Sequence, residues 1–181
     1  GGHAAAAAAA PAAPASPPQA KVAVTKSSVV KATGDPHLVN MYGQKFDIYH
    51  TGVHTLIRVP KMEPGRTLLK VAADVQQFGG ACADLYFRSM NITGRWVPRK
   101  NGLYFQATRK SKQYAAKWLS LGKMKLKVVW GHTNRGVKYL NFFVKHLADV
   151  SNKFAVGGLL GEDDHTAVST PKRKCKRTVT L

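Results

Sequence analysis

From Lys21 onward, apolar and polar residues alternate with a period of two in short segments separated by Gly, Pro, Asn or basic turns. The segments are rich in β-branched and aromatic residues, which favour β-strands. They comprise residues 21–30, 37–49, 54–59, 67–76, 85–92, 103–109, 125–130 and 137–147. Residues 111–122 have helical spacing, although a bent strand would explain them too. Short strands at regular spacing predict an all-β fold, an antiparallel β-sandwich.

Residues 1–20 contain alanine and proline but no Asp, Glu, Lys or Arg. Their prolines forbid one continuous helix, and so little apolar surface cannot offset the entropy of the chain. We therefore expect a disordered Ala/Pro-rich linker at 1–20, one β domain at 21–171 and a basic tail at 172–181. A domain of this size can bury a sizeable core.

Charge limits the choice of partner. The chain carries 28 Lys and Arg against 9 Asp and Glu, a formal net charge of +19. Fourteen of the basic residues and no acidic one lie between Leu85 and Ala148, which predicts an almost unbroken positive surface there. Polyanions, acidic lipid surfaces or acidic proteins are the natural counterparts of such a surface. Outside the alanine-rich start there is no run of eighteen apolar residues, so no membrane span is expected.

Two motifs that lie more than a hundred residues apart in the chain are most informative when they are considered jointly. The early one is "GDPHLVNMYGQKFD", which begins at Gly34, and the late one is "VGGLLGEDD", which begins at Val156. Together they resemble the von Willebrand factor type D domain. The matching positions are Gly34, Asp35, Pro36, His37, Gly43, Phe46, Asp47, Gly158, Leu159 and Gly161. The resemblance covers most of the chain and implies a β-sandwich in which the two motifs are neighbours.

The chain also departs from this family. Val53, Gly157 and Leu160 stand where the family has cysteines, so the chain resembles a cysteine-poor branch. Only Cys82 and Cys175 are present, and a single bridge between them is left open.

A calcium site is implied at the end of the late motif. Calcium takes six to eight oxygen ligands, and the candidates here are Glu162, Asp163 and Asp164, with the Thr166 hydroxyl. Tyr42 replaces the family's calcium-ligating Asp in the early motif, which weakens the case. The alternative is that the acidic loop provides counter-charge for nearby lysines.

The Asp35–Pro36 bond is a candidate for self-cleavage. An aspartate carboxyl can attack its own carbonyl carbon while the proline nitrogen departs, and His37 could donate the proton at mildly acid pH. Some secreted mucins that share this tetrapeptide cleave themselves there. The structural interpretation, which we favour, is that Pro36 fixes φ at the entry to a strand while His37 packs beneath the sheet.

Asn91 begins the triplet Asn-Ile-Thr, an acceptor for N-glycosylation. It precedes "GRWVPRK", which we expect to form an exposed turn. If the chain is secreted, as the resemblance implies, Asn91 would carry a glycan.

The sequence predicts a non-enzymatic interaction module, because no catalytic motif accompanies these features. We expect it outside the cell or at the cell surface, joined to other domains of a longer chain. Its partners would be an anionic polysaccharide or an acidic protein, bound through Arg95, Arg99, Lys100, Arg109, Lys110, Lys112, Lys123, Lys125 and Lys127. Besides the self-processing domain, the alternative is a nucleic-acid binder that stacks bases on Trp96, Tyr104, Phe105, Tyr114, Trp118 and Trp130.

Overall fold

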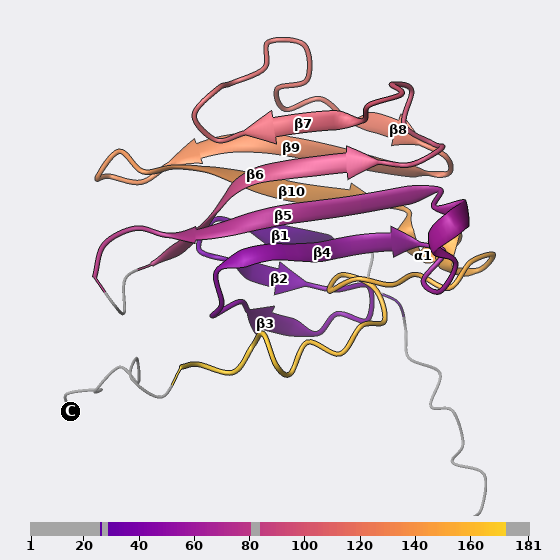
Figure 1. Ribbon diagram of the computed structural model, residues 1–181, viewed down its shortest axis with the longest axis horizontal. Helices are drawn as coiled ribbons and strands as arrows, with labels where there is room; N and C mark the ends of the chain where they lie inside the picture. Colours follow the sequence, from indigo (N-terminus) through magenta and orange to yellow (C-terminus); the bar gives the residue numbers. More distant parts are fainter. Residues whose placement is uncertain (1–25, 27–28, 81–83, 173–181) are drawn as a thin grey trace, which may run out of the picture.

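Two antiparallel sheets lie face to face in the computed structural model, which describes residues 26, 29–80 and 84–172 (Figure 1). The antiparallel β-sandwich expected from the sequence is confirmed. The predictions for the linker at 1–20, for Cys82 and Cys175, and for the tail beyond Lys172 lie outside the described residues. No helix in the described part of the chain is long and apolar enough to cross a membrane.

The larger sheet joins the two ends of the domain. It has six strands in the order β3-β2-β1-β10-β9-β8. Their bounds are β1 Val30–Thr33, β2 His37–Val39, β3 Lys45–Asp47, β8 Leu119–Leu121, β9 Met124–His132 and β10 Lys138–Lys145. Pairing of β1 with β10 places the early motif in the same sheet as the last strands of the basic segment, the region between Leu85 and Ala148 that has no acidic residue.

The smaller sheet is a meander of consecutive strands in the order β4-β5-β6-β7. Their bounds are β4 Gly52–Val59, β5 Leu69–Gln77, β6 Leu85–Thr93 and β7 Leu103–Gln106. A 3-10 turn, η1 (Pro64–Arg66), joins β4 to β5. The short helix α1 (Leu147–Ser151) follows β10.

The segment 37–49 forms a hairpin of β2 and β3, and its turn over residues 40–44 contains the Tyr-Gly pair of the early motif. One local prediction needs correction. The helical alternative for residues 111–122 is wrong, since this segment forms turns and then the short strand β8. The unforeseen helix α1 buries Leu147 and Val150, which are three residues apart and so share one face.

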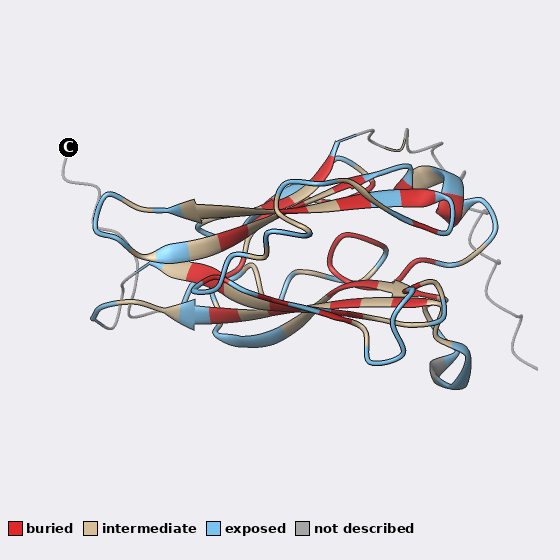
Figure 2. Cartoon of the chain, turned by 90° about the horizontal axis from the view of Figure 1, so that it is seen from above, coloured by how far each residue is buried: buried red, intermediate tan, exposed pale blue. Residues whose placement is uncertain are grey.

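Both layers of the sandwich contain buried residues (Figure 2), and these pack into one hydrophobic core. Strand β5 shows the reason, because its residues alternate between buried and half-buried along its length. Phe87, Phe105 and Phe142 are the largest fully buried side chains. Burial of one such side chain contributes about 1.5–3 kcal/mol to folding.

The early and late motifs meet, as the sequence led us to expect. The Met41 amide donates to the Leu160 carbonyl at 2.9 Å, and the Tyr49 amide donates to the Val168 carbonyl at 2.9 Å. The Phe46 ring is stacked on the His165 ring, with centroids 3.8 Å apart. Residues more than a hundred positions apart therefore form one side of the sandwich.

The late motif also covers strand β4, which forms one edge of the smaller sheet. Arg58 and Gly157 exchange backbone hydrogen bonds of 2.9 and 2.8 Å. The amides of Leu159 and Leu160 donate to the carbonyls of Thr55 and Leu56 at 3.0 and 2.9 Å. Covering an edge strand in this way protects its backbone from pairing with another chain.

Candidate anion-binding surfaces

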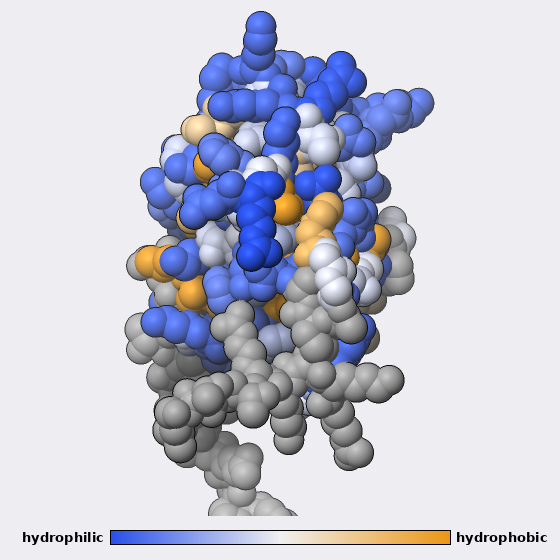
Figure 3. Space-filling model, turned by 90° about the vertical axis from the view of Figure 1, so that its left-hand side faces the viewer, coloured by the Kyte–Doolittle hydropathy of each residue, from blue (hydrophilic) through white to orange (hydrophobic). Residues whose placement is uncertain are grey.

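A pocket of about 410 Å³ lies beside the edge strand β7, beneath the loop that joins β7 to β8. This volume is in the range of sites that hold a small ligand or one unit of a polymer. In Figure 1 the loop stands above β7 at one edge of the sandwich. Viewed from one end of the sandwich, that edge of the surface is predominantly hydrophilic (Figure 3).

Packing against the core holds the pocket in shape. The buried Phe105 ring meets the Tyr114 ring edge-on at 6.0 Å and the Trp130 ring at 5.8 Å. The indole Nε1 of Trp130 donates to the Gln106 carbonyl at 2.8 Å and so ties β9 to the end of β7. The Ser111 carbonyl accepts from the Ala115 amide at 2.9 Å, which closes a turn of the loop.

The pocket is basic. Its lining includes Arg99, Arg109, Lys110 and Lys112, and none of the described residues that line it is acidic. All four cationic side chains belong to exposed residues, and none makes an ion pair with a described acidic residue. Cations clustered without counter-charge repel one another, and a bound anion would relieve that repulsion.

One arginine of the pocket is held in position. The Arg99 guanidinium lies 5.5 Å from the centre of the Tyr114 ring and donates to Gln113 Oε1 at 3.3 Å. Tyr104, which is 61% exposed, lies in the same lining and accepts a hydrogen bond from Gln106 Nε2 at 3.4 Å. The lining of the pocket thus includes both a planar cation and an exposed aromatic ring.

A second basic group lies on the outer face of the six-stranded sheet. The ammonium groups of Lys127 and Lys145 stand 4.7 and 4.2 Å from the centre of the Trp118 ring. Lys145 is paired directly across the strands with Lys125. Like charges directly opposite one another are destabilising, so this face also gains from a bound anion.

The nine predicted anion-binding residues are distributed over several parts of the surface, and their role in anion binding stays a prediction. Four line the pocket, and Lys125 and Lys127 lie on β9. Arg95, Lys100 and Lys123 are exposed on loops outside both groups. The outer face of the smaller sheet presents instead the uncharged cross-strand row Thr55, Ala72, Asn91 and Tyr104.

The aromatic residues proposed as a base-stacking platform are mostly packed. Phe105 is buried, and Trp96, Tyr114 and Trp130 lie half-buried against the core. Among the six, only Tyr104 is an exposed residue, while Trp118 is covered by two lysines. A continuous stacking surface for single-stranded nucleic acid is not formed by these six rings.

The acidic loop contacts other protein groups. Lys61 Nζ lies 3.8 Å from Glu162 Oε2 and 4.0 Å from Asp163 Oδ1. Asp164 Oδ1 accepts hydrogen bonds from both the amide and the hydroxyl of Thr166, at 2.9 and 2.6 Å. These two bonds hold the pKa of Asp164 below its usual value.

These carboxylates do not converge on a common point. Within residues 26, 29–80 and 84–172, no group of three or more His, Cys, Asp or Glu side chains is arranged to hold a metal ion. Glu162 accepts a hydrogen bond from the Tyr42 hydroxyl at 3.5 Å, and burial, then the nearby carboxylate, raises the pKa of Tyr42. Lys61 provides positive charge beside the loop, and the calcium site stays a prediction.

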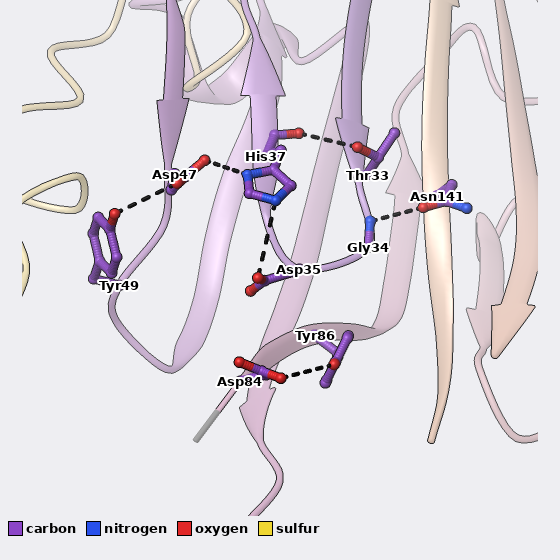
Figure 4. Close-up of polar contacts among 9 residues, drawn as sticks. All are labelled: Thr33, Gly34, Asp35, His37, Asp47, Tyr49, Asp84, Tyr86 and Asn141. Atoms are coloured by element: carbon purple, nitrogen blue, oxygen red, sulfur yellow. Dashed lines mark hydrogen bonds and ion pairs between the residues drawn. The ribbon is translucent and has the colours of Figure 1, made fainter. Parts of the chain in front are cut away.

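The early motif forms an exposed polar cluster (Figure 4). His37 Nδ1 lies 2.5 Å from Asp47 Oδ1, and His37 Nε2 lies 3.9 Å from Asp35 Oδ2. The Tyr49 hydroxyl donates to the other oxygen of Asp47 at 3.4 Å. The expectation that His37 packs beneath the sheet is wrong, because its side chain is 61% exposed and stands on the outer face.

Pro36 is the buried residue of the tetrapeptide. Its carbonyl accepts a hydrogen bond from the Ile48 amide at 3.0 Å, and the amide of Gly34 donates to Asn141 Oδ1 at 2.7 Å. The backbone on both sides of the Asp35–Pro36 bond is therefore anchored to the sheet.

Asn91 lies within strand β6, as the strand segment 85–92 predicted, and ahead of the turn at residues 94–100. Its residue is nonetheless exposed, between Ala72 and Tyr104 on the outer face of the smaller sheet. Its glycosylation stays a prediction.

Comparison with known proteins assigns no family. No family model matches the chain, and no curated protein matches it significantly. The resemblance of the two motifs to the von Willebrand factor type D domain therefore stays a prediction, and function is argued from the surfaces described above.

Proposed function

We propose that this chain is a non-enzymatic interaction module that binds anionic partners through its basic surface. The observation that carries the proposal is the pocket beside β7, where four cationic side chains gather and no described lining residue is acidic. The von Willebrand factor type D resemblance adds a setting: a domain of a longer, secreted or cell-surface chain, with calcium as a stabiliser of its acidic loop.

The chemistry of the pocket suits anions that present several oxygens. An arginine can donate two parallel hydrogen bonds to a carboxylate, sulfate or phosphate group, and Arg99 is already oriented by Tyr114 and Gln113. The lysines at 110 and 112 add charge without fixing direction. An acidic polysaccharide or an acidic protein segment satisfies this arrangement.

We expect Arg99→Gln combined with Arg109→Gln to weaken binding of a sulfated oligosaccharide about tenfold. Two exposed charge contacts contribute about 0.2–1 kcal/mol each, and 1.4 kcal/mol corresponds to a factor of ten. Fluorescence anisotropy with a labelled heparin oligosaccharide at constant salt measures the change.

The matched control is Arg66→Gln combined with Arg135→Gln, which removes the same charge from exposed residues that do not line the pocket. We expect this control to retain most of the affinity. Equal losses in the two double variants would show that net charge alone governs binding, and the pocket would lose its assigned role.

Self-cleavage at Asp35–Pro36 is a second candidate, favoured by the contact of His37 with two aspartates. In this reaction the Asp35 side-chain oxygen attacks the Asp35 carbonyl carbon and forms a cyclic anhydride. The bond to the Pro36 nitrogen breaks, and the nitrogen takes a proton from His37, which Asp47 orients. Water then opens the anhydride, leaving a free Asp35 carboxyl terminus and a new amino terminus at Pro36.

Incubation at about pH 5.5, just below the ordinary pKa of histidine, should then yield one new amino terminus at Pro36. Intact-mass spectrometry over time measures the reaction, and Asp35→Ala should abolish it while His37→Gln slows it. A wild-type mass that stays unchanged would remove this candidate and leave the interaction module unaffected.

A further inference from the structure

A row of side chains crosses five strands on the outer face of the six-stranded sheet. Each member is the direct cross-strand partner of the next, as the registers of β3, β2, β1, β10 and β9 show. In order, the row comprises Lys45, Val39, Lys31, Phe143 and Lys127. Lysines and apolar residues therefore alternate along a line perpendicular to the strands.

The row points outward along its whole length. Lys31 lies between the buried residues Val30 and Ala32, and Lys127 lies between Leu126 and Val128, which are also buried. Because side chains on a strand alternate between faces, both lysines are on the face opposite the core. Lys45, beside the buried Phe46, faces the same way.

The spacing of the charges is set by the sheet. Neighbouring strands lie roughly 4.8 Å apart, so lysines two strands apart stand about 10 Å from each other. The row ends at Trp118, whose ring lies 4.7 Å from Lys127 Nζ. The adjacent pair Lys125 and Lys145 adds charge at this end.

Little negative charge opposes the row. On the outer face of the described strands of this sheet, the acidic residue is Asp47, which lies one row away and contacts His37. Lys31, Lys45 and Lys127 make no ion pair with a described acidic residue. The row is therefore open to an external anion.

We propose that this row, which we call the lysine row, binds a linear acidic polysaccharide that crosses the strands. One sugar unit is about as long as the distance between two neighbouring strands. Acidic groups on alternate sugars would therefore meet Lys45, Lys31 and Lys127 in turn. The apolar faces of the intervening sugars would lie over Val39 and beside Phe143, whose ring centre is 5.4 Å from the Lys127 ammonium. This assignment rests on the proposed function. It adds the chemical class of the partner and states that the partner runs perpendicular to the strands.

The twist of the sheet favours a flexible chain as the ligand and disfavours a stiff nucleic-acid duplex. Successive strands rotate by roughly 20–25°, so a row across five strands turns through about a right angle in total. A stiff DNA duplex would touch only part of such a row. Single-stranded nucleic acid carries a charge on every unit, at about 3.4 Å per step along a stacked strand, so only every third phosphate would face a lysine of the row.

The test compares two triple variants with equal loss of charge. Lys31→Gln, Lys45→Gln and Lys127→Gln remove the lysine row, whereas Lys70→Gln, Lys138→Gln and Lys153→Gln remove lysines outside it. Binding of labelled heparin is measured by anisotropy at several salt concentrations, after circular dichroism has shown that both variants are folded.

We expect the first triple variant to weaken heparin binding at least tenfold. It should also lower the slope of log K against log salt by about two to three, because ionic contacts are lost. The control triple variant should change the affinity and the salt slope far less.

Trp118→Ala tests whether the ring that positions two of the lysines matters for binding. This residue lies outside the buried core, so the variant should fold. We expect weaker heparin binding with an unchanged salt slope, because the ring that orients the ammonium groups of Lys127 and Lys145 is lost and no charge is removed. A single-stranded DNA of the same total charge serves as the competing probe and should bind more weakly than heparin.

The outcomes are distinguishable. If wild-type protein binds neither heparin nor DNA, the proposed function itself fails. If it binds heparin but the two triples behave alike, the lysine row is not the site and the proposed function stands. If the wild-type protein binds the single-stranded DNA more tightly than heparin, and the first triple loses this binding too, the polysaccharide assignment would be overturned.

Discussion

Gly158→Ala is expected to destabilise the domain by about 2–5 kcal/mol, which is a large part of the total stability of a typical domain. Gly158 has φ of +89°, and a Cβ there would collide with the Leu56 carbonyl oxygen and lie 2.5 Å from its carbon. Both atoms belong to the backbone of β4 and cannot move aside like a side chain. The late motif would have to leave β4, and its hydrogen bonds to that strand would be lost.

Gly136→Ala is the matched control. Gly136 has a similar φ of +80°, but nothing lies within 4 Å of a Cβ built on it. It should therefore show only the cost of the left-handed conformation, about 1–2 kcal/mol. Urea unfolding followed by circular dichroism measures both variants, and equal losses would mean that the late motif does not pack on β4 as described.

Asn40→Ala should lower stability by about 2–4 kcal/mol. Asn40 is 1% exposed and is the buried polar residue of the described core. Its Oδ1 accepts the amides of Tyr42 and Gln44 at 3.1 and 3.0 Å, and its Nδ2 donates to Gln44 Oε1 at 2.7 Å. Removal of the side chain leaves backbone donors without their acceptor, and each costs about 1–3 kcal/mol when buried.

The same turn presents the Met41 amide to Leu160, so the loss should spread to the contact between the motifs. Asn134→Ala provides the comparison, because Asn134 is an exposed turn residue and such changes usually stay within about 0.5 kcal/mol. Chemical denaturation of the two variants is the measurement. A cost for Asn40→Ala as small as that for Asn134→Ala would contradict the role of this turn.

The fold was largely predictable because period-two patterning is a local signal. The alternation in β5, where buried and half-buried residues follow one another, is visible directly in the sequence. The helix α1 was missed because five residues are too few to establish a helical period. The Tyr42-Gly43 pair indicates the turn between β2 and β3, but no local pattern indicates that Asn40 is buried within it.

The candidate site was predictable only in part. Arg99, Arg109, Lys110 and Lys112 are near in sequence, so their gathering in one pocket follows from their clustering in the chain. Lys31 and Lys45 lie outside the basic segment, and only the strand registers align them with Lys127. Register between strands far apart in the chain is set by packing of the whole sheet, which one sequence does not show.

The most direct test of the account is a map of backbone amide shifts during titration of the wild-type domain with a sulfated heparin oligosaccharide. It should be made at about 0.15 M salt, where weak long-range attraction is largely screened. The account predicts saturable shifts concentrated in residues 99–114 and 118–127 and at Lys31 and Lys45. Shifts that do not saturate, or that centre on the uncharged row of Thr55, Ala72 and Asn91, would contradict it.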